Sequence, residues 1–395
     1  MRVLFANEKL GWFGGVEQCV ADSASGLRRR GHDCILAHGP EARDADAYRS
    51  SFDRTLGARE LGAEGTEARG FADIVRETRP DVIYLHKVPA SLIRTDHGAA
   101  VVRMIHDHDV YCPRRHKYYA WNRQPCHARA GWRCWLDGAF LARDSETRGL
   151  RFENIREKLS AMRAHWDLER LLVGSRFMES QLRENGCPEE RIRIVPPVVE
   201  LDGERTPRSG SSDSGARFLY VGQLIRGKGV DALLQAMAAI RDAGIDATLT
   251  LAGDGSDRSR LESIAASRRL EPTVTFEGFV PHADLGARYA GADAVVVPSR
   301  WPEPFGLVGL EAMRHARPVV AFDSGGIGDW LESEETGILV PSGDIAGLAQ
   351  ALTRIAMDRT LARKLGEAGR RRYDSEFATE HLVDRLETAL EEAAA

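Results

Sequence analysis

The chain has 395 residues, which is long for a single hydrophobic core and predicts two domains of ordinary size. Hydrophobic residues make up 43% of the sequence, and no apolar run reaches the roughly 18 residues of a transmembrane helix, so we expect no membrane span. The net charge of −5 argues against general binding of nucleic acids. The opening run MRVLFANEKLGWFGG has too short an apolar core for a secretory signal, which predicts a cytoplasmic protein.

The cysteine and arginine contents indicate the cellular environment and the source of the protein. Six cysteines are too few for a disulfide scaffold, and thiols in the cytosol stay reduced. Cys19, Cys34 and Cys187 lie among apolar neighbours, so we expect them to be buried, inert thiols. Arginine heavily outnumbers lysine, which is typical of a bacterial protein from a GC-rich genome.

The N-terminal half alternates between strand and helix patterns. Strands are expected at residues 2–6, 34–37, 82–85, 100–105, 171–174 and 192–195. Helices are expected at residues 16–30 and 147–166, and from the N-cap Ser175 to about residue 185, where Gly186 ends the helix. The polar stretch 41–70 is expected to form loop and helix. Such alternation predicts a parallel, doubly wound sheet whose ligands bind beyond the carboxyl ends of its strands.

A pair of glycines stands at the mouth of the first expected helix. Gly14 and Gly15 permit a positive φ and the close approach of a ligand. The helix N-terminus that they open carries a partial positive charge and suits an anion. Two adjacent glycines are also common in simple turns, so the pattern alone is a weak signal.

A histidine follows the strand expected at residues 100–105. His106 therefore stands at the edge of the sheet where ligands bind, although a lone histidine is more often structural. His108 is a secondary candidate. The triplet Asp107-His108-Asp109 imitates a metal-binding DxD pattern, but such triplets are common by chance and we discount it.

The segment from residue 111 to residue 135 has an unusual composition. It contains six Arg or Lys, six Tyr or Trp, no acidic residue, and three of the six cysteines. These side chains suit an anionic acceptor or a lipid headgroup surface, and the alternative is a solvated loop with its rings folded inward. Zinc is a further alternative, although no CxxC pair is present. The zinc candidates are Cys112, Cys126 and Cys134, with His116 or His127.

The C-terminal half repeats the alternating pattern after a linker. Residues 202–215 are rich in Gly, Ser, Asp and Arg and predict a flexible surface loop. Strands are expected at residues 217–221, 248–252, 274–277, 295–297 and 319–322. Helices are expected at residues 230–242, 258–268, 345–358, 361–371 and 379–392, and after Gly306 for about three turns.

Two cations lie in the glycine-rich loop that follows the first strand of this half. Lys228, and with it Arg226, would sit where a leaving diphosphate lies in a doubly wound domain. Fixed cations there neutralise the developing charge without Mg²⁺. The alternative is an ordinary pair of surface side chains.

The rest of the chain is organised around residues 295–311, VVVPSRWPEPFGLVGLE. The β-branched run predicts a buried parallel strand, the prolines fix a stiff loop, and a helix begins after Gly306. Glu303 precedes that helix and Glu311 lies within it. Two carboxylates would repel a bare phosphate at the helix N-terminus but bind vicinal diols, so the pattern favours a sugar diphosphate nucleotide. The alternative is an ordinary βα unit with solvated glutamates.

This segment resembles the signature of the retaining family-four glycosyltransferases, E-P-F-G followed by a second Glu. The matching residues are Glu303, Pro304, Phe305, Gly306 and Glu311. The resemblance implies that Glu303 contacts the donor sugar and that Glu311 holds the ribose hydroxyls. It also implies that the backbone amides of Phe305, Gly306 and Leu307 contact sugar and phosphate.

Other parts of the chain are similar to the same family. The run GGVEQ resembles the glycine loop of this family. His106 corresponds to the family's histidine at a strand end beside the donor sugar, and Lys228 corresponds to its diphosphate-binding lysine. The segment that recognises the nucleobase through its backbone corresponds to Gly278, Phe279 and Val280. Two positions depart from the family pattern, with Gln223 where Arg is usual and Asp329 where Glu is common.

The resemblance implies two doubly wound, Rossmann-like α/β domains facing across a cleft, the GT-B arrangement. The expected parts are an acceptor-side domain 1–197 with an insertion at 107–146, a linker 198–215, a nucleotide-sugar domain 216–375, and a helix 376–395 that returns to the first domain. We expect a metal-independent, retaining glycosyltransferase that takes a UDP-sugar as co-substrate and a glycan, lipid-linked or small-metabolite acceptor. His106, Glu303 and Lys228 are the expected catalytic residues. Peripheral contact with the inner face of a membrane is an expectation from the insertion.

Three alternatives stay open at this point. A nucleotide-sugar epimerase or hydrolase of the same fold would convert the donor without an acceptor. A catalytically silent sugar-nucleotide-binding protein is conceivable because of Gln223 and Asp329. A metal-dependent or redox module would be centred on Cys112, Cys126 and Cys134.

Overall fold

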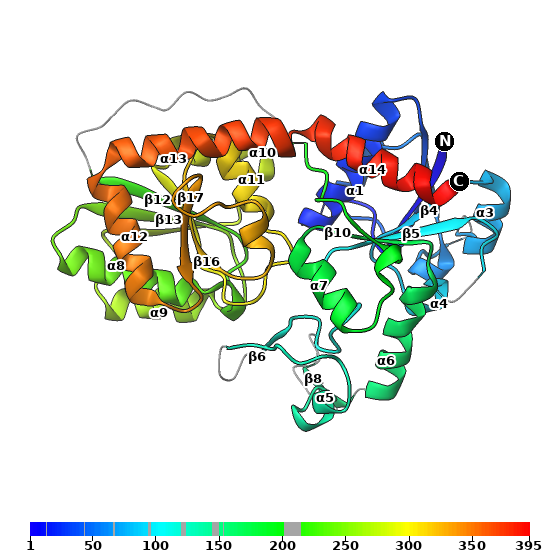
Figure 1. Ribbon diagram of the computed structural model, residues 1–395, viewed down its shortest axis with the longest axis horizontal. Helices are drawn as coiled ribbons and strands as arrows, with labels where there is room; N and C mark the ends of the chain where they lie inside the picture. The colour runs from blue at the N-terminus through cyan, green and yellow to red at the C-terminus, as the bar shows by residue number, and fades with distance from the viewer. Residues whose placement is uncertain are drawn as a thin grey trace. The chain divides into compact units, whose positions relative to one another are not determined.

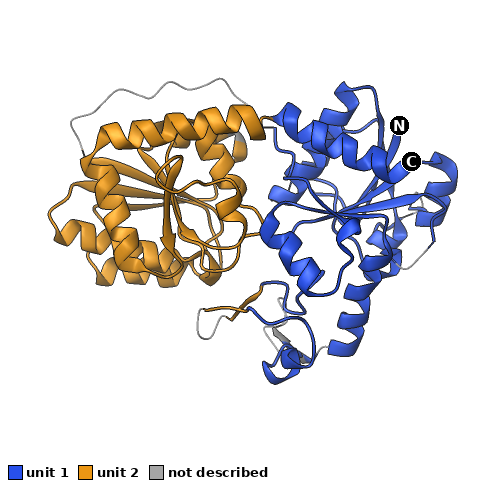
Figure 2. Cartoon of the chain, in the orientation of Figure 1, with its two compact units in different colours: residues 1–116, 127–200, 379–395 blue, residues 117–126, 201–378 orange. Residues whose placement is uncertain are grey.

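A computed structural model describes most of the chain. The described residues are 1–12, 14–42, 44–65, 68–93, 96–119, 124–143, 150–152, 154–200 and 215–395. The flexible loop expected at residues 202–215 therefore lies, except for its last residue, outside the described residues. Contacts divide the chain into unit 1, residues 1–116, 127–200 and 379–395, and unit 2, residues 117–126 and 201–378 (Figure 2).

Unit 1 is built on a parallel sheet of seven strands in the order β11-β10-β5-β4-β1-β2-β3. Its strands are β1 Arg2–Asn7, β2 Asp33–His38, β3 Arg54–Gly57, β4 Val82–Leu85, β5 Ala100–Ile105, β10 Arg170–Val173 and β11 Ile192–Ile194. Its helices are α1 Gly15–Arg29, α2 Ala45–Arg49, α3 Phe71–Thr78, α4 Ala90–Ile93, α5 Arg133–Leu136, α6 Ile155–Arg163, α7 Arg176–Glu184 and α14 Thr379–Ala394. A hairpin of β8 Leu141–Arg143 and β9 Leu150–Phe152 stands apart from this sheet.

Unit 2 contains a parallel sheet of six strands in the order β14-β13-β12-β15-β16-β17. Its strands are β12 Ala216–Val221, β13 Ala247–Ala252, β14 Val274–Gly278, β15 Ala294–Val297, β16 Val319–Asp323 and β17 Gly337–Pro341. Its helices are α8 Val230–Asp242, α9 Arg258–Ser267, α10 His282–Gly291, α11 Leu307–Arg314, α12 Ile345–Met357 and α13 Arg359–Arg372. The two-stranded ladder of β6 Tyr118–Tyr119 and β7 Gln124–Pro125 is also grouped with this unit.

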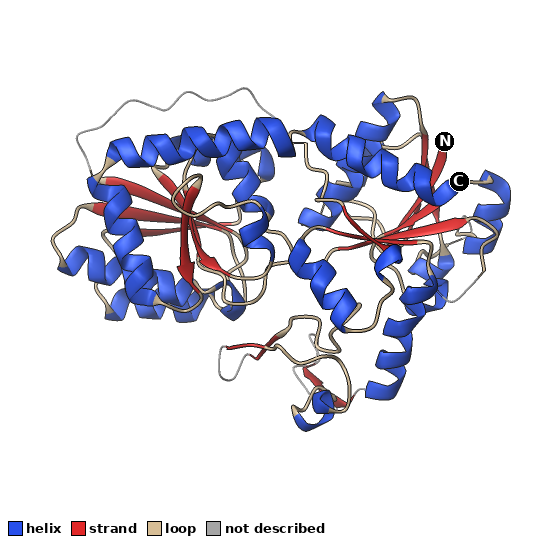
Figure 3. Ribbon diagram, in the orientation of Figure 1, coloured by secondary structure: helices blue, strands red, loops and turns tan. Residues whose placement is uncertain are grey.

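In both units, helices cover the two faces of the sheet (Figures 1 and 3). Strands buried on both sides need continuous apolar sequence, and β15 has all four of its residues buried. The predicted fold class of two doubly wound parallel α/β domains is confirmed. None of the helices that the structure describes combines the length and the apolar composition needed to cross a bilayer.

Several local predictions from sequence are confirmed. The Ser175 hydroxyl accepts a hydrogen bond from the Met178 amide at 3.2 Å and caps α7, and Gly186 has a φ of +92° just after that helix. Cys19, Cys34 and Cys187 are buried as free thiols.

Two stretches of unit 1 differ from the expectation. The region 41–70, expected as loop and helix, contains the edge strand β3, which pairs with β2. The helix expected at 147–166 begins only at Ile155, because the Asn154 side chain accepts hydrogen bonds from the amides of Arg156 and Glu157. Residues 150–152, at the start of the expected helix, instead pair with β8.

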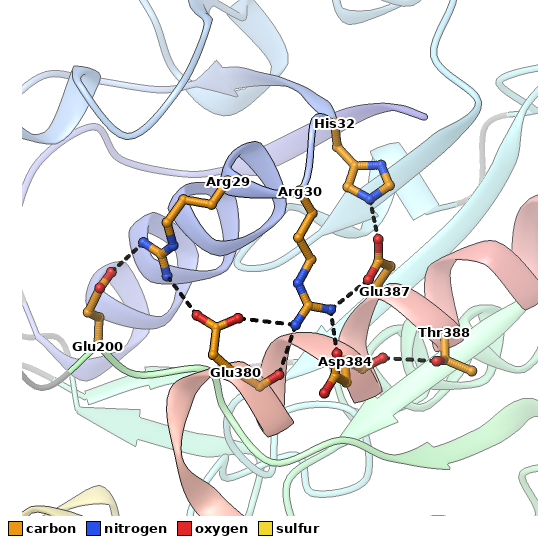
Figure 4. Close-up of polar contacts among 8 residues, drawn as sticks. All are labelled: Arg29, Arg30, His32, Glu200, Glu380, Asp384, Glu387 and Thr388. Carbon is orange, nitrogen blue, oxygen red and sulfur yellow. Dashed lines mark hydrogen bonds and ion pairs between the residues drawn. The ribbon is translucent and has the colours of Figure 1, made fainter.

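The C-terminal helix α14 packs against α1 within unit 1, and charged side chains hold the two together (Figure 4). The Arg30 guanidinium, at the end of α1, lies 2.6 Å from both Asp384 and Glu387 and 3.2 Å from Glu380. The His32 ring also hydrogen-bonds to Glu387, at 2.5 Å. Hydrogen bonds from His32 and Arg30 hold the pKa of Glu387 below its ordinary value. The end of the chain is thus tied to the first βα unit.

Candidate active site

The first group of candidate side chains lies in unit 2, in the loop that follows β15. Glu303 stands in this loop, and its side chain is only 6% exposed. Its carboxylate accepts hydrogen bonds from Lys228 Nζ, at 2.7 and 3.0 Å to the two oxygens, and from the Ser299 hydroxyl. A buried carboxylate needs such partners to remain charged. The loop therefore holds a defined acidic group at the carboxyl edge of the sheet.

Lys228 comes from the loop between β12 and α8. Its Nζ lies 4.9 Å from the centre of the Trp301 ring, in addition to its contacts with Glu303. An ammonium group has three N–H donors, so one remains for a ligand after the two bonds to Glu303. Arg226, the other expected cation, has a side chain that is 55% exposed and lies 3.9 Å from the Asp257 carboxylate. Lys228 is held in place, and Arg226 is only loosely held.

The start of α11 supplies backbone donors next to Glu303. Gly306 is the N-cap residue, with a φ of +98° that glycine adopts readily, and no side chain caps the helix. Phe305 is buried, and its carbonyl oxygen accepts a hydrogen bond from Trp330 Nε1 at 2.6 Å. The first-turn amides, beginning with Leu307, therefore have a fixed position at the positive end of a helix. The helix has eight residues, somewhat shorter than the expected three turns.

A glycine turn after β16 supports the same loop. Gly325 has a φ of +65°, and a Cβ there would lie 2.3 Å from the Glu303 carbonyl oxygen. The Gly326 amide donates a hydrogen bond to that oxygen at 2.7 Å. This glycine turn therefore clamps the backbone of Glu303. Asp329, in place of the more common Glu, lies in the 3-10 turn that follows.

Glu311 occupies the second turn of α11 and is 9% exposed. Its carboxylate accepts a hydrogen bond from the Tyr289 hydroxyl and lies 3.5 Å from the His282 ring. Burial and the adjacent Glu311 charge raise the pKa of Tyr289 well above its ordinary value, so the phenol stays a donor. Glu311 is thus oriented by a side chain from α10, an element that the sequence did not reveal.

The segment expected to recognise the base ends β14. Gly278 has a φ of +81°, and its carbonyl oxygen accepts a hydrogen bond from the Gly253 amide at 2.7 Å. Phe279 is 81% exposed, and Val280 is half-buried. An aromatic ring with so large an exposed face is available to stack on a planar ligand.

The second group lies in unit 1, at the carboxyl ends of β4 and β5. His106 Nε2 lies 2.9 Å from Nδ1 of His86, a fully buried histidine whose own Nε2 has no hydrogen-bond partner among the described residues. An orphaned buried N–H is rarer than an orphaned acceptor, so we assign the His86 proton to Nδ1, with His106 Nε2 accepting. Burial, assisted by the Lys87 charge, lowers the pKa of His106 to about 3. His106 is therefore a neutral ring with its proton on Nδ1.

Ion pairs surround this histidine pair. Lys87 Nζ forms a close ion pair with Asp107, and Arg103, itself 3% exposed, donates to Asp109 at 3.2 Å. The charges of Arg103 and Lys87 outweigh burial and hold the pKa of Asp109 below its ordinary value. Burial and the Asp109 charge raise the pKa of Asp107. Both carboxylates of the triplet are paired with cations. His108, the secondary candidate, hydrogen-bonds to the Tyr111 hydroxyl at 2.7 Å.

The glycine loop at α1 differs from the expectation in its backbone. Gly14 is extended, with a φ of 174°, and neither Gly14 nor Gly15 is among the glycines with a positive φ. The left-handed residue of this loop is Gly11, where a Cβ would lie 2.5 Å from the Ala42 Cβ. Gly14 has open space instead, since a Cβ there would meet only the Glu17 carboxylate, at 3.9 Å. Both glycines permit a positive φ but do not adopt one, and they lie at the N-terminus of α1.

The expected zinc ligands are not brought together. Within the described residues, no three His, Cys, Asp or Glu side chains form a group that could hold a metal ion. Cys112 is buried in the apolar core of unit 1. The candidates Cys112, Cys126, Cys134 and His116 are close to one another along the chain, but they do not form such a group in the structure.

The sequence did not reveal the partners that orient these groups. Ser299 and Trp301 lie beside Glu303 and Lys228, Tyr289 holds Glu311, and His86 holds His106. Only the position of His86 directly after a predicted strand was a usable signal. Trp301 and Tyr289 become visible only when separate elements of one unit are folded together, and Ser299 only when its loop is folded.

Two parallel α/β units of this kind, each with polar side chains at the carboxyl edge of its sheet, define the GT-B class of glycosyltransferases. Residues 204–372 match the family model described as glycosyl transferases group 1, and residues 13–202 match that of glycosyltransferase family 4. The chain belongs to these glycosyltransferases.

Similar sequences agree with this assignment, and similar solved structures share the fold. A glycogen synthase of Mycobacterium tuberculosis is 28% identical over 397 residues, covering 92% of this chain and 87% of that protein. An alpha-D-kanosaminyltransferase of Streptomyces kanamyceticus is 36% identical over 206 residues, covering 50% of this chain and 53% of that protein. A sucrose-phosphate synthase of Thermosynechococcus elongatus has a TM-score of 0.74 at 23% identity, covering 99% of this chain and 98% of that one. HepE of Anabaena, solved with UDP-glucose, has a TM-score of 0.72 at 18% identity, covering 99% of this chain and all of that one.

Proposed function

We propose that this enzyme transfers a sugar from a UDP-sugar to an acceptor hydroxyl, with retention of the anomeric configuration and without a metal ion. The observation that carries the proposal is the buried Glu303, held by Lys228 beside the partly exposed start of α11, with Glu311 one turn further along the helix. The solved complexes of HepE with UDP and UDP-glucose support the choice of nucleotide.

The leaving diphosphate is stabilised by fixed positive groups in this proposal. The remaining N–H donor of Lys228 and the backbone amides of Phe305, Gly306 and Leu307, at and just before the start of α11, donate to one anion. Arg226 adds a flexible, solvated cation. These groups supply charge neutralisation that a divalent cation supplies in other transferases, so the reaction needs no metal. The departing phosphate oxygen takes the acceptor proton on the face from which it leaves, which gives retention.

The other residues recognise the nucleotide. Glu311, oriented by Tyr289, accepts hydrogen bonds from the ribose hydroxyls. The backbone at Gly278 and Val280 reads the base, and the exposed ring of Phe279 stacks on it.

Two further groups recognise the donor sugar and the acceptor. In unit 2, Glu303 orients hydroxyls of the donor sugar. In unit 1, the neutral His106 donates a hydrogen bond from Nδ1 to a sugar hydroxyl. Gly14 and Gly15 open a helix N-terminus of unit 1 that binds a phosphate or the acceptor. Unit 1 is the acceptor side in this proposal, and a glycan, a lipid-linked sugar or a small metabolite is the acceptor class. Catalysis takes place on the cytoplasmic side of the membrane.

The proposal is tested by ligand-induced thermal stabilisation. UDP at about 100 times its Kd should stabilise the folded protein by about 2.7 kcal/mol, and GDP and ADP should stabilise it less. Glu311→Ala should abolish most of the UDP effect. The exposed Glu335→Ala, on the surface of the same unit, is the matched control and should leave it unchanged.

Turnover separates the proposal from its alternatives. With a UDP-sugar and an acceptor panel, Lys228→Ala should bind UDP but transfer sugar at least about 100-fold more slowly. Activity should persist after treatment with EDTA. Equal UDP stabilisation in Glu311→Ala and the control would contradict the site. Release of free sugar or an epimer as the main product, or UDP binding without any turnover, would favour the hydrolase, epimerase or silent-binding alternatives.

A further inference from the structure

Exposed apolar side chains concentrate in one small part of unit 1. Nine large apolar side chains of the described residues are exposed, and five of them lie between residues 132 and 152. We call these five the apolar surface cluster: Trp132 at 72% exposure, Trp135 at 53%, Leu136 at 76%, Leu141 at 41% and Phe152 at 76%. Single exposed apolar residues are ordinary, but a contiguous group of this kind marks an interaction site.

The cluster has a defined backbone. Trp132 is the N-cap of the short helix α5, which carries Trp135 and Leu136, and β8 follows almost at once, as Figure 1 shows at the edge of unit 1. The Leu141 and Phe152 positions face each other across the β8–β9 hairpin. Phe140 joins the two parts, because its ring lies 5.3 Å from that of Trp135 and stacks on that of Phe152 at 6.3 Å.

Basic side chains are frequent in the segment that leads into this cluster. Residues 111–135 contain six Arg or Lys and no Asp or Glu. Arg115, Arg129 and Arg133 are exposed there, whereas Asp137 is the exposed acidic residue that follows α5. The local charge is therefore positive although the whole chain carries −5. Tryptophan and leucine next to arginine match the surface of a lipid bilayer, which has an apolar interior and anionic headgroups. Amphipathic rings lie at the level of the headgroups, and guanidinium groups pair with the phosphates.

We propose that the apolar surface cluster and its arginines dock unit 1 on a bilayer containing anionic phospholipid. The rings of Trp132, Trp135 and Phe152 and the side chains of Leu136 and Leu141 enter the headgroup region, and Arg129 and Arg133 contact the lipid phosphates. This contact is independent of sugar transfer and does not rest on the proposed donor chemistry. It holds the unit that we propose as the acceptor side at a membrane surface, where lipid-linked acceptors are present.

The test is flotation of the full-length protein with lipid vesicles. The protein should float with vesicles of equal parts phosphatidylcholine and phosphatidylglycerol and stay in solution with vesicles of phosphatidylcholine alone. The double variant Trp132→Ser/Leu136→Ser should lose flotation, because both side chains are exposed and their loss leaves the fold intact. Met357→Ser, which removes an equally exposed apolar side chain from α12 of unit 2, is the matched control and should float normally.

Charge reversal tests the electrostatic part. Arg129→Glu and Arg133→Glu should each weaken binding at least about fivefold, as expected for the loss of one cation near an anionic surface. Arg363→Glu, an exposed change in α13, should have no such effect. Absence of flotation in the unmodified protein, or equal flotation of the cluster variants and their controls, would overturn the proposal. A dimer of the unmodified protein in light scattering that Trp132→Ser/Leu136→Ser dissociates, without any flotation, would assign the surface to a second copy instead.

Discussion

The contact between Lys228 and Glu303 gives a prediction that separates stability from catalysis. The Glu303 side chain is 6% exposed and that of Lys228 is 21% exposed, so Lys228→Met would leave a nearly buried carboxylate with only the Ser299 hydroxyl as a donor. Breaking a buried pair typically costs about 3–5 kcal/mol. Because water reaches Lys228, we expect the lower limit, about 3 kcal/mol, which corresponds to a decrease in Tm of about 6–12 °C for a unit of this size.

A second change should reverse this loss. The double variant Lys228→Met/Glu303→Gln removes both charges and keeps a side chain that hydrogen-bonds to Ser299. Replacing both partners of a buried ion pair with neutral groups of similar shape is often close to neutral. We therefore expect the double variant to recover most of the 3 kcal/mol while its rate of sugar transfer stays as low as that of Lys228→Met or falls further.

Chemical and thermal unfolding measure the first quantity, and initial rates with a UDP-sugar measure the second. The transition of unit 2 has to be followed separately, since a protein with two compact units need not unfold in one step. The isolated change Glu303→Gln completes the cycle and gives the interaction energy. A double variant no more stable than Lys228→Met would refute the claim that the two side chains form a mutually dependent buried pair. Recovery of transfer together with stability would refute a catalytic role for the lysine.

Three further changes test other parts of the structure. Gly325→Ala should lower the stability of unit 2 by about 3 kcal/mol or more in thermal unfolding, because its Cβ would lie 2.3 Å from a backbone carbonyl oxygen. The control Gly343→Ala, which also has a positive φ but lies in open space, should cost about 1 kcal/mol in the same experiment. Tyr289→Phe removes the hydrogen bond to the Glu311 carboxylate and should cost about 1.5–3 kcal/mol and weaken UDP binding in calorimetry, whereas unchanged affinity would contradict the orienting role. Glu387 has a lowered pKa in the folded state, so its stabilising contribution is present above the ordinary value of about 4.3 and lost as the pH falls through the folded-state value. Glu387→Gln should therefore lose less stability than the unmodified protein over that acidic range, as measured by urea unfolding at a series of pH values.

Sequence patterns predicted most of the regular structure because buried parallel strands leave a strong local signal. The run at 295–297 is such a case, and so are the helices that begin at Ser175 and after Gly306. The two wrong predictions each have a local cause. The edge strand β3 is short and only partly buried, so it has neither a continuous apolar run nor a clear alternation. The charged stretch 147–166 has helical composition throughout, but Asn154 starts the helix late.

For the candidate site, the sequence alone predicted which side chains could bind a ligand. These are Glu303 and Glu311 near a helix start, Lys228 in a glycine-rich loop, and His106 after a strand. Residue type and spacing along one βα unit suffice for that, because a strand end and the next helix start are always neighbours. The tertiary structure alone decided what each group is bonded to. Lys228 meets Glu303, Tyr289 meets Glu311, and His86 meets His106 through contacts between different elements of one unit, and the folded loop brings Ser299 to Glu303. Charge state and orientation depend on these contacts, since burial and hydrogen-bond partners are properties of the packed unit and not of any local segment.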